Sequence, residues 1–284
     1  MTGTAPAPTP DAAVLRDDVR RALAEDVGPG DLTAELLAPG SALDTRVVCR
    51  ENAVLCGRPW FDETFAQLDP SIVVDWSATD GDTLSPGQTV CRVQGPAAPL
   101  LTGERTALNF IQTLSGTASE TRRYVAALAG TGTRLLDTRK TLPGLRLAQK
   151  YAVRCGGGDN HRIGLFDAIL VKENHIRAAG GIGAAVRLAR ERHGAAFVEV
   201  EVENLAELDE VLEAGAERAL LDNFDLDTLR NGVARAGGRL ELEASGNVTL
   251  DTLRPIAETG VQFISTGAIT KHLHAIDFSR RFVD

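Results

Sequence analysis

Charged and small polar residues follow a series of short apolar runs in the second half of the chain, at the points where strands would end. They are Thr138, Arg139 and Lys140; Lys172; Glu201; Asp222; Ser245, Gly246 and Asn247; and Thr266, Gly267 and Ala268. The earlier runs end in cations, whereas the later ones end in carboxylates or small turn residues. Arginine forks bind carboxylates and phosphates, and the backbone N–H groups of tight turns bind phosphate. This set of residues predicts a site for a polyanionic small molecule.

The segment 138–172 is strongly cationic although the chain as a whole is acidic. It holds seven Lys and Arg residues against two aspartates, a net charge of +5 in a chain of net charge −9. A local excess of positive charge concentrates and orients an anionic substrate. Arg146, Lys150 and Arg154 recur every four residues, as on one stripe of a helix, and this stripe could instead be a solvated basic face.

The sequence CGGGDNHRIG at residues 155–164 is a candidate ligand-binding loop. Three successive glycines let the backbone approach a ligand closely. Arg162 would add a cation, and His161 could donate a hydrogen bond to a carboxylate, although a lone histidine is equally often structural. Cys155 is better explained as a small packing residue than as a nucleophile, because no base is specified for it.

Glu201 and Asp222 each follow a strand-like run and should point towards the same mouth. Two carboxylates in a basic pocket can hold a divalent metal, bind sugar hydroxyls or stabilise a developing positive charge. They could also do no more than balance the neighbouring cations.

Strand-like runs alternate with helical patterns from residue 134 onward. Glu201, Asp222, Ser245 and Gly267 are separated by 21, 23 and 22 residues, which is one strand and one helix per repeat. The pattern predicts a parallel sheet with helices outside. An open doubly wound sheet and a closed barrel both fit this spacing. The polar strand ends favour an α/β barrel, because barrels assemble their sites there.

The first half of the chain has a different texture. Residues 11–26 carry apolar side chains at helical spacing, residues 44–95 form short β-rich runs, and residues 104–129 read as a long helix. The turn at residues 80–88 resembles that of biotinyl and lipoyl carrier domains. No lysine precedes Lys140, so a carrier function is not expected.

These patterns predict a disordered tail at residues 1–10, an N-terminal α/β sandwich domain at 11–115 and a catalytic α/β-barrel domain at 116–284. The last segment, 271–284, could pack back on the N-terminal domain.

Composition excludes several classes of protein. The chain of 284 residues is 43% hydrophobic and 24% charged, which is ordinary for a soluble globular protein. No apolar run approaches the roughly 18 residues of a membrane span. The acidic balance argues against a nucleic-acid partner. Four scattered cysteines without a C-x-x-C pair indicate free thiols, and with no signal peptide in the sequence we expect a cytoplasmic protein.

Segments along nearly the whole chain closely resemble the quinolinate phosphoribosyltransferase family. They are EDVGPGDLTAELL (25–37), LLTGERTALNFIQTLSGTAS (100–119), the segment from DTRK to ENHI (137–176), VEVEVENLAE (198–207), LLDNF (220–224), EASGNV (243–248) and STGAIT (265–270). The family usually has SVGALT at the last of these, so Thr266 replaces a small apolar residue.

The resemblance implies a reaction and an architecture. Quinolinate and phosphoribosyl pyrophosphate (PRPP) would give nicotinate mononucleotide, pyrophosphate and carbon dioxide, with Mg²⁺ as cofactor, in NAD biosynthesis. The fold would be that of a type II phosphoribosyltransferase, an open α/β sandwich followed by an incomplete α/β barrel of fewer than eight strands. The protein would be a homodimer, with the sandwich of one subunit capping the barrel mouth of the other.

The resemblance also implies a role for each site residue. Arg139, His161, Arg162 and Lys172 match the positions that hold the two quinolinate carboxylates, and Arg105 matches the arginine that reaches across from the partner subunit. Lys140 matches a lysine on the PRPP side.

The remaining matches lie at the later strand ends. Glu201 and Asp222 match carboxylates near the ribose hydroxyls and magnesium. The turns Ser245–Asn247 and Thr266–Ala268 match phosphate-binding turns, and Thr138 is a further substrate-binding candidate. The expected catalytic residues are Lys140, Lys172, Glu201 and Asp222.

Three alternatives stay open on sequence alone. A class I aldolase could use Lys172 as a Schiff-base nucleophile, but this leaves Arg139, Arg162 and the glycine-rich loop unexplained. A paralogue associated with molybdenum transport is disfavoured by the full Arg/His/Lys set. A non-catalytic anion-binding module would have little use for Glu201 and Asp222.

Overall fold

The computed structural model describes residues 11–283, so the tail expected at residues 1–10 lies outside the described residues. The chain forms two compact units. Unit 1 contains the described residues up to Arg122, Leu142–Gly157 and the segment from His272, whereas unit 2 contains Arg123–Thr141 and Gly158–Lys271. No described helix is both long and apolar enough to cross a membrane.

Unit 1 is built on an antiparallel four-stranded sheet. Its strands are β1 (Ala42–Cys49), β3 (Val73–Trp76), β5 (Thr89–Pro96) and β12 (Phe278–Phe282), in the order β12-β1-β5-β3. The short strands β2 (Ala53–Val54) and β4 (Thr83–Leu84) form a separate pair, and η1 (Ala34–Leu36) is a single 3₁₀ turn. The inner face of the sheet contributes to a core of buried residues such as Val47, Val93 and Phe278.

Four helices complete unit 1. They are α1 (Ala12–Val27), α2 (Arg58–Leu68), α3 (Ala97–Ala127, in unit 1 up to Arg122) and α4 (Arg146–Gly156). Asp11 starts α1, because its side chain accepts hydrogen bonds from two backbone N–H groups of the first turn. The apolar face of α1, predicted from the spacing at residues 11–26, is buried as Leu15, Val19 and Leu23.

The sequence-based division has a boundary between residues 115 and 116 and a possible return of residues 271–284 to the N-terminal domain, whereas in the structure Leu142–Gly157 also belongs to unit 1. Helix α4 packs Ala148, Ala152 and Cys155 into the core formed with α1 and α3. Strand β12 pairs antiparallel with β1 and so extends the sheet of unit 1. Gly116 allows the last segment to lie against α3, because a Cβ there would be 2.2 Å from the backbone oxygen of His274.

Unit 2 is an incomplete α/β barrel. Its six strands are all parallel and follow the order β6-β11-β10-β9-β8-β7. They are β6 (Arg134–Leu136), β7 (Ile169–Val171), β8 (Val198–Val202), β9 (Arg218–Asp222), β10 (Glu241–Ser245) and β11 (Phe263–Ser265). The edge strands β6 and β7 are not paired with each other among the described residues. The predicted fold class is therefore confirmed.

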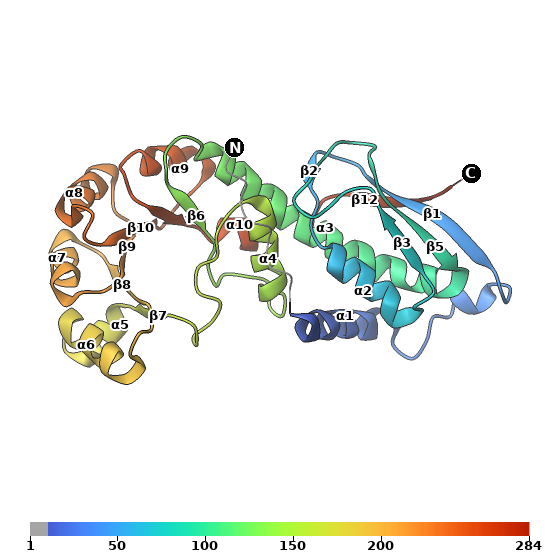
Figure 1. The fold of residues 1–284 in the computed structure, drawn as a ribbon, viewed down its shortest axis with the longest axis horizontal. Coiled ribbons are helices and arrows are strands. Elements are labelled where there is room, and N and C mark those ends of the chain that lie inside the picture. The colour runs from blue at the N-terminus through green and yellow to red at the C-terminus, as the bar shows by residue number, and fades with distance from the viewer. Residues whose placement is uncertain (1–10, 284) are drawn as a thin grey trace. The chain divides into compact units, whose positions relative to one another are not determined.

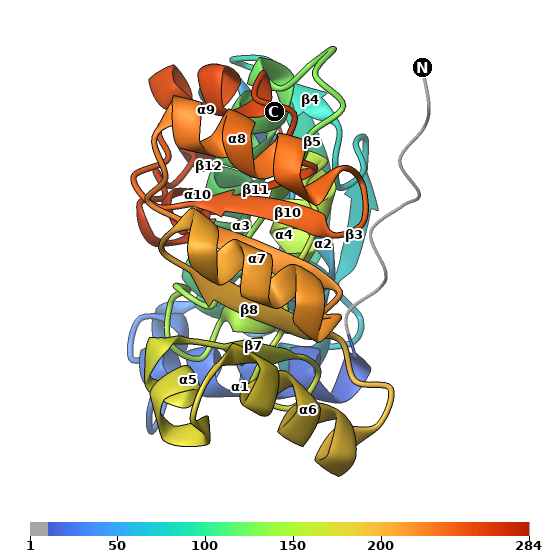
Figure 2. The ribbon, with the colours of Figure 1, turned by 90° about the vertical axis from the view of Figure 1, so that its left-hand side faces the viewer.

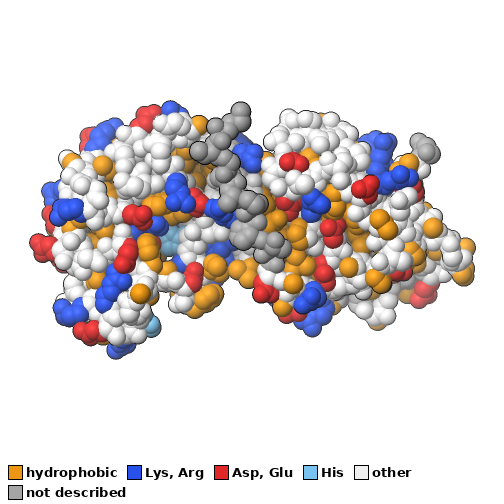
Figure 3. Space-filling model, in the orientation of Figure 1, with side chains coloured by type: hydrophobic (Ala, Val, Ile, Leu, Met, Phe, Trp, Pro, Cys, Tyr) orange, Lys and Arg blue, Asp and Glu red, His pale blue; other side chains and the backbone are white. Residues whose placement is uncertain are grey.

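Helices surround this curved sheet on its outer side (Figures 1 and 2). They are α5 (Glu173–Ala179), α6 (Ile182–His193), α7 (Leu205–Ala214), α8 (Leu226–Ala236) and α9 (Leu250–Ala257), and the short α10 (Ala268–Lys271) follows β11. The side chains of both charge signs that cover this part of the molecule in Figure 3 are interspersed. Because every strand is parallel, all six carboxyl ends lie at one end of the barrel.

Candidate active site

A cavity of about 490 Å³ at the carboxyl ends of the strands brings together nine of the residues predicted from the sequence. They are Thr138, Arg139, Lys140, His161, Arg162, Lys172, Glu201, Asp222 and Ser245. The other lining residues are Leu170, Leu220, Glu243 and Ser265. Both units contain cavities, but this one lies at the carboxyl ends of the parallel strands and combines cations with carboxylates there.

The remaining predicted residues are not in the lining. Gly246 and Asn247 follow β10, and Thr266, Gly267 and Ala268 follow β11. Gly267 nevertheless lies against the cavity wall, because a Cβ there would be 2.8 Å from Lys140 Cδ. Arg105 belongs to unit 1, where it is an exposed residue of α3.

Thr266 replaces the small apolar residue usual in the family, and the structure gives its hydroxyl a local role. The side chain is buried, and its Oγ1 accepts a hydrogen bond from Ala268 N at 3.1 Å. The Thr266 hydroxyl therefore caps the turn after β11 by accepting a hydrogen bond from the backbone of that turn.

Two guanidinium groups lie close together in the cavity. The pKa of Arg162 is lowered, first by burial and then by the positive charge of Arg139. Arginine stays charged at neutral pH in spite of such a shift. Their mutual repulsion would be relieved by an anion bound between them, so this wall of the cavity suits a carboxylate or a phosphate.

In the same cavity, Lys172 Nζ forms an ion pair with Glu201 Oε2. The pKa of Asp222 is raised, first by burial and then by the negative charge of Glu201, while Lys172 opposes the shift. The negative charges of Glu201 and Asp222 therefore repel each other. Paired carboxylate oxygens fit Mg²⁺, which is often held by one or two carboxylates together with substrate phosphates.

His161 is fixed by contacts within the protein. Its Nε2 lies 2.7 Å from Glu199 Oε2, and its Nδ1 accepts a hydrogen bond of 2.7 Å from Arg162 N. The buried carboxylate of Asp137 accepts hydrogen bonds from His161 N and from Asn160 Nδ2. These contacts hold the loop that presents Arg162, while direct contact of the imidazole with substrate stays a prediction.

Sequence analysis missed two buried carboxyl groups, Glu243 in the wall of the cavity and Glu199 next to it. Their side chains are 2% and 0% exposed. Burial raises the pKa of both, and the charge of Glu199 helps to raise that of Glu243 to about 8. Arg218 Nη1 lies 3.4 Å from Glu243 Oε2. A signal was present, because FVEVEVE and LELEAS place acids where buried parallel strands normally carry apolar residues.

Two groups of potential metal ligands occur among the described residues, and both are already engaged. His161, Glu199 and Glu243 share the contacts just described with Arg218 beside them. Cys56, Asp80 and Cys155 form the other group, in which Asp80 accepts a hydrogen bond from Tyr151 Oη at 2.8 Å and further bonds from backbone N–H groups. Neither arrangement is as open as that of Glu201 and Asp222.

The helical stripe of Arg146, Lys150 and Arg154 lies on α4 in unit 1. It is not a purely solvated face, since Lys150 is 3% exposed. All four cysteines are buried, and none forms a disulfide, so the predicted free thiols are confirmed. Cys155 packs in the hydrophobic core.

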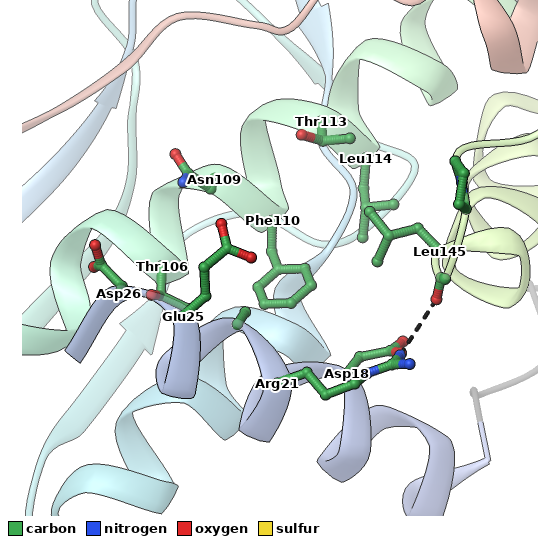
Figure 4. Close-up of a pocket in the computed structure, with 13 residues that line it drawn as sticks. Asp18, Arg21, Glu25, Asp26, Thr106, Asn109, Phe110, Thr113, Leu114 and Leu145 are labelled. Atoms are coloured by element: carbon green, nitrogen blue, oxygen red, sulfur yellow. Dashed lines mark hydrogen bonds and ion pairs between the residues drawn. The ribbon is translucent and has the colours of Figure 1, made fainter. Parts of the chain in front are cut away.

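A further cavity, of about 400 Å³, lies in unit 1 between α1, α3 and the loop before α4 (Figure 4). Phe110 and Leu114 project into it from α3, and Glu25 and Asp26 lie on α1. Its lining contains one cation, Arg21, which forms an ion pair with Asp18, and two further carboxylates, Glu25 and Asp26. This balance of charge is unfavourable for an anionic substrate.

Comparisons with known proteins agree with the geometry. The model of the quinolinate phosphoribosyl transferase C-terminal domain matches residues 117–281, and that of the N-terminal domain matches residues 31–115. The chain belongs to the quinolinate phosphoribosyltransferase family. The family predicted from the sequence is thus confirmed.

Relatives of the family match over most of the chain. A probable carboxylating nicotinate-nucleotide pyrophosphorylase of Bacillus subtilis is 41% identical, covering 90% of this chain and 89% of its own. A decarboxylating, mitochondrial quinolinate phosphoribosyltransferase of Nicotiana tabacum is 40% identical, covering 93% and 81%. The structure of the nicotinate-nucleotide pyrophosphorylase from Francisella tularensis superimposes with a TM-score of 0.94 at 46% identity, covering 98% and 99%.

Proposed function

We propose that this protein transfers the phosphoribosyl group of PRPP to quinolinate, with decarboxylation. The products are nicotinate mononucleotide, pyrophosphate and carbon dioxide, a step of NAD biosynthesis. Membership of the family supports this reaction. The observation that carries it is a single cavity in which Arg139, Arg162 and Lys172 lie with Glu201 and Asp222.

The cations would hold and select the pyridine substrate. Quinolinate has two carboxylates, and Arg139, Arg162 and Lys172 offer the charges to pair with both. Nicotinate has one carboxylate and would leave a cation of the cavity without its anion, which is costly in a partly buried site. The two guanidiniums repel each other in the free protein, so the binding energy includes relief of that repulsion.

The carboxylates would act on the ribose. Departure of pyrophosphate leaves an electron-poor, oxocarbenium-like carbon, and the negative charge of Glu201 or Asp222 would stabilise it. Lys140 would contact the anionic PRPP side of the cavity. Once the pyridine nitrogen carries the ribose, the cationic ring stabilises the electron pair that departing carbon dioxide leaves on the ring carbon next to the nitrogen. A proton from water then adds to this carbon and gives nicotinate mononucleotide.

Glu201 and Asp222 would hold magnesium, since both line the cavity and carboxylate oxygens are ligands of this hard cation. Magnesium would neutralise charge on the pyrophosphate leaving group. The turns Ser245–Asn247 and Thr266–Ala268 would hold a phosphate through backbone N–H groups.

We further propose that the protein is a homodimer. Arg105 is exposed on α3 of unit 1 and does not line the cavity of unit 2. We propose that it completes the quinolinate site of the partner subunit and that the protein acts in the cytoplasm.

The deciding experiment measures pyrophosphate release from PRPP and Mg²⁺ with quinolinate and, in parallel, with nicotinate. Release with quinolinate alone, matched by carbon dioxide, is the expected result. Release with nicotinate alone would refute the two-carboxylate role of Arg139, Arg162 and Lys172. The absence of pyrophosphate release with both quinolinate and nicotinate would refute the proposed function. Borohydride trapping with a carbonyl substrate tests the aldolase alternative, in which Lys172 would have to leave its ion pair with Glu201 to act as a nucleophile.

A further inference from the structure

Asn223 links two strand-end turns through its side chain. Asn247 Nδ2 donates a hydrogen bond to Asn223 Oδ1 at 3.2 Å, and Asn223 N donates to the backbone oxygen of Ser245 at 2.9 Å. Asn223 Nδ2 donates in turn to Asp222 Oδ2 at 2.9 Å. A single carboxamide therefore joins the carboxylate at the end of β9 to the turn that follows β10.

The backbone is shaped for this link. Asn223 has φ 57° and Asn247 has φ 50°, and they are the non-glycine residues with positive φ in the described range 11–283. This left-handed region is unfavourable for most residues, and asparagine tolerates it best after glycine. Such conformations cluster at functional sites, where the surrounding structure maintains them.

Gly246 leaves the space that the carboxamide occupies. A Cβ at this position would lie 2.2 Å from Asn223 Oδ1 and 2.6 Å from its Cγ. The Asn223 side chain thus lies directly against the backbone of the Ser245–Asn247 turn. The close packing fixes the carboxamide from one side, and the bonds to Asp222 and Asn247 fix its two polar atoms.

We propose that Asn223 is a positioning residue that orients Asp222 and sets its distance from the Ser245–Asn247 turn. The inference rests on the proposed function, in which Asp222 faces the ribose and the turn binds a phosphate of the same PRPP molecule. Two groups that bind one ligand must keep a fixed spacing if both contacts are to form together. Asn223 is not among the residues that line the cavity, so it acts through Asp222 and the turn.

The test replaces Asn223 by glycine and by aspartate. Asn223→Gly keeps the backbone free to adopt positive φ but removes both side-chain bonds. Asn223→Asp keeps an oxygen for Asn247 but loses the donor to Asp222 and places a second carboxylate beside it. We expect kcat/KM for PRPP to fall roughly tenfold or more in both variants, about 1.4 kcal/mol, with the KM for quinolinate unchanged.

Asn204→Gly is the matched control. Asn204 lies in the connection after β8, where its side chain accepts a hydrogen bond from Glu207 N and caps α7. It contacts none of the cavity residues in the described hydrogen bonds, so its kinetic constants should match those of the wild type. Calorimetric titration of PRPP in Mg²⁺ buffer provides a readout independent of turnover, and weaker binding is expected for the Asn223 variants only.

The outcomes separate this inference from the proposed function. An active wild type with an Asn223→Gly variant of unchanged PRPP kinetics and binding overturns the positioning role alone, because asparagine would then serve only the backbone. Equal changes in the constants for PRPP and quinolinate also overturn it. A wild type that releases no pyrophosphate overturns the proposed function and this inference together.

Discussion

Replacing Glu243 by glutamine tests the ionisation of a buried carboxyl group in the wall of the active-site cavity. The Glu243 side chain is 0% exposed, and burial together with the charge of Glu199 raises its pKa to about 8. At pH 7 the group is therefore mostly protonated in the folded protein but ionised in the unfolded chain. Glutamine has nearly the shape of protonated glutamate, so Glu243→Gln should keep the contacts with His161 and Arg218.

The raised pKa sets the sign and the size of the effect. In the wild type, the stability contributed by proton binding is complete below the ordinary pKa of 4.5 and is lost as the pH rises towards about 8. The slope is about 1.4 kcal/mol per pH unit, so about 3 kcal/mol is lost between pH 4.5 and pH 7. Glutamine does not titrate. The stability of Glu243→Gln relative to wild type should therefore increase by this amount over the same range.

The assay is urea unfolding of both proteins from pH 5 to pH 8. Circular dichroism should be used, because Trp60 and Trp76 both lie in unit 1 and their fluorescence would not follow unit 2. Glu199→Gln is the comparison variant. It removes the carboxylate that pairs with the buried His161 at 2.7 Å, and should destabilise the protein. A Glu243→Gln variant that loses stability relative to wild type as the pH rises would refute the reasoning, since Glu243 would then be an ionised partner of Arg218.

Three further predictions concern the reaction. Arg162→Ala should lower turnover in the pyrophosphate assay at least ~100-fold, about 2.7 kcal/mol. Arg187→Ala, on the outer helix α6, is the control and should leave turnover unchanged. Near-normal activity of Arg162→Ala would contradict the role of Arg162 in holding quinolinate. Mixing inactive Arg105→Ala and Lys172→Gln subunits should restore about a quarter of wild-type activity, because half of the dimers contain one intact site; no recovery after verified subunit exchange would argue against completion of the site by the partner. EDTA should abolish pyrophosphate release and added Mg²⁺ should restore it, and release that persists in EDTA would count against the metal.

Much of the cavity could be predicted because its residues stand at the carboxyl ends of parallel strands. Glu201, Asp222 and Ser245 recur at the period of one strand and one helix, Lys172 follows the preceding strand β7, and parallel strands bring such ends to one place. The argument needs only the order of the elements. It does not depend on how the side chains pack.

Depth inside the barrel could not be predicted in the same way. Glu199 and Glu201 alternate along β8 and belong to the same face of the strand, yet their side chains are 2% and 21% exposed. Pairing places Glu199 beside Arg218 and Glu201 beside Leu220. Register with neighbouring strands therefore separates a carboxylate in the buried layer from one that reaches the cavity.

The sequence by itself determined the family, the α/β fold class and the cations and carboxylates at the strand ends, because these depend on residue types and their period along the chain. Only the tertiary structure placed α4 in unit 1, buried Glu199 and Glu243 against His161, and joined Asn223 to Asp222 and to the turn after β10. These features depend on contacts between residues far apart in sequence and on backbone angles such as the positive φ of Asn223. The local periodicity of the sequence indicates neither the long-range contacts nor the backbone angles.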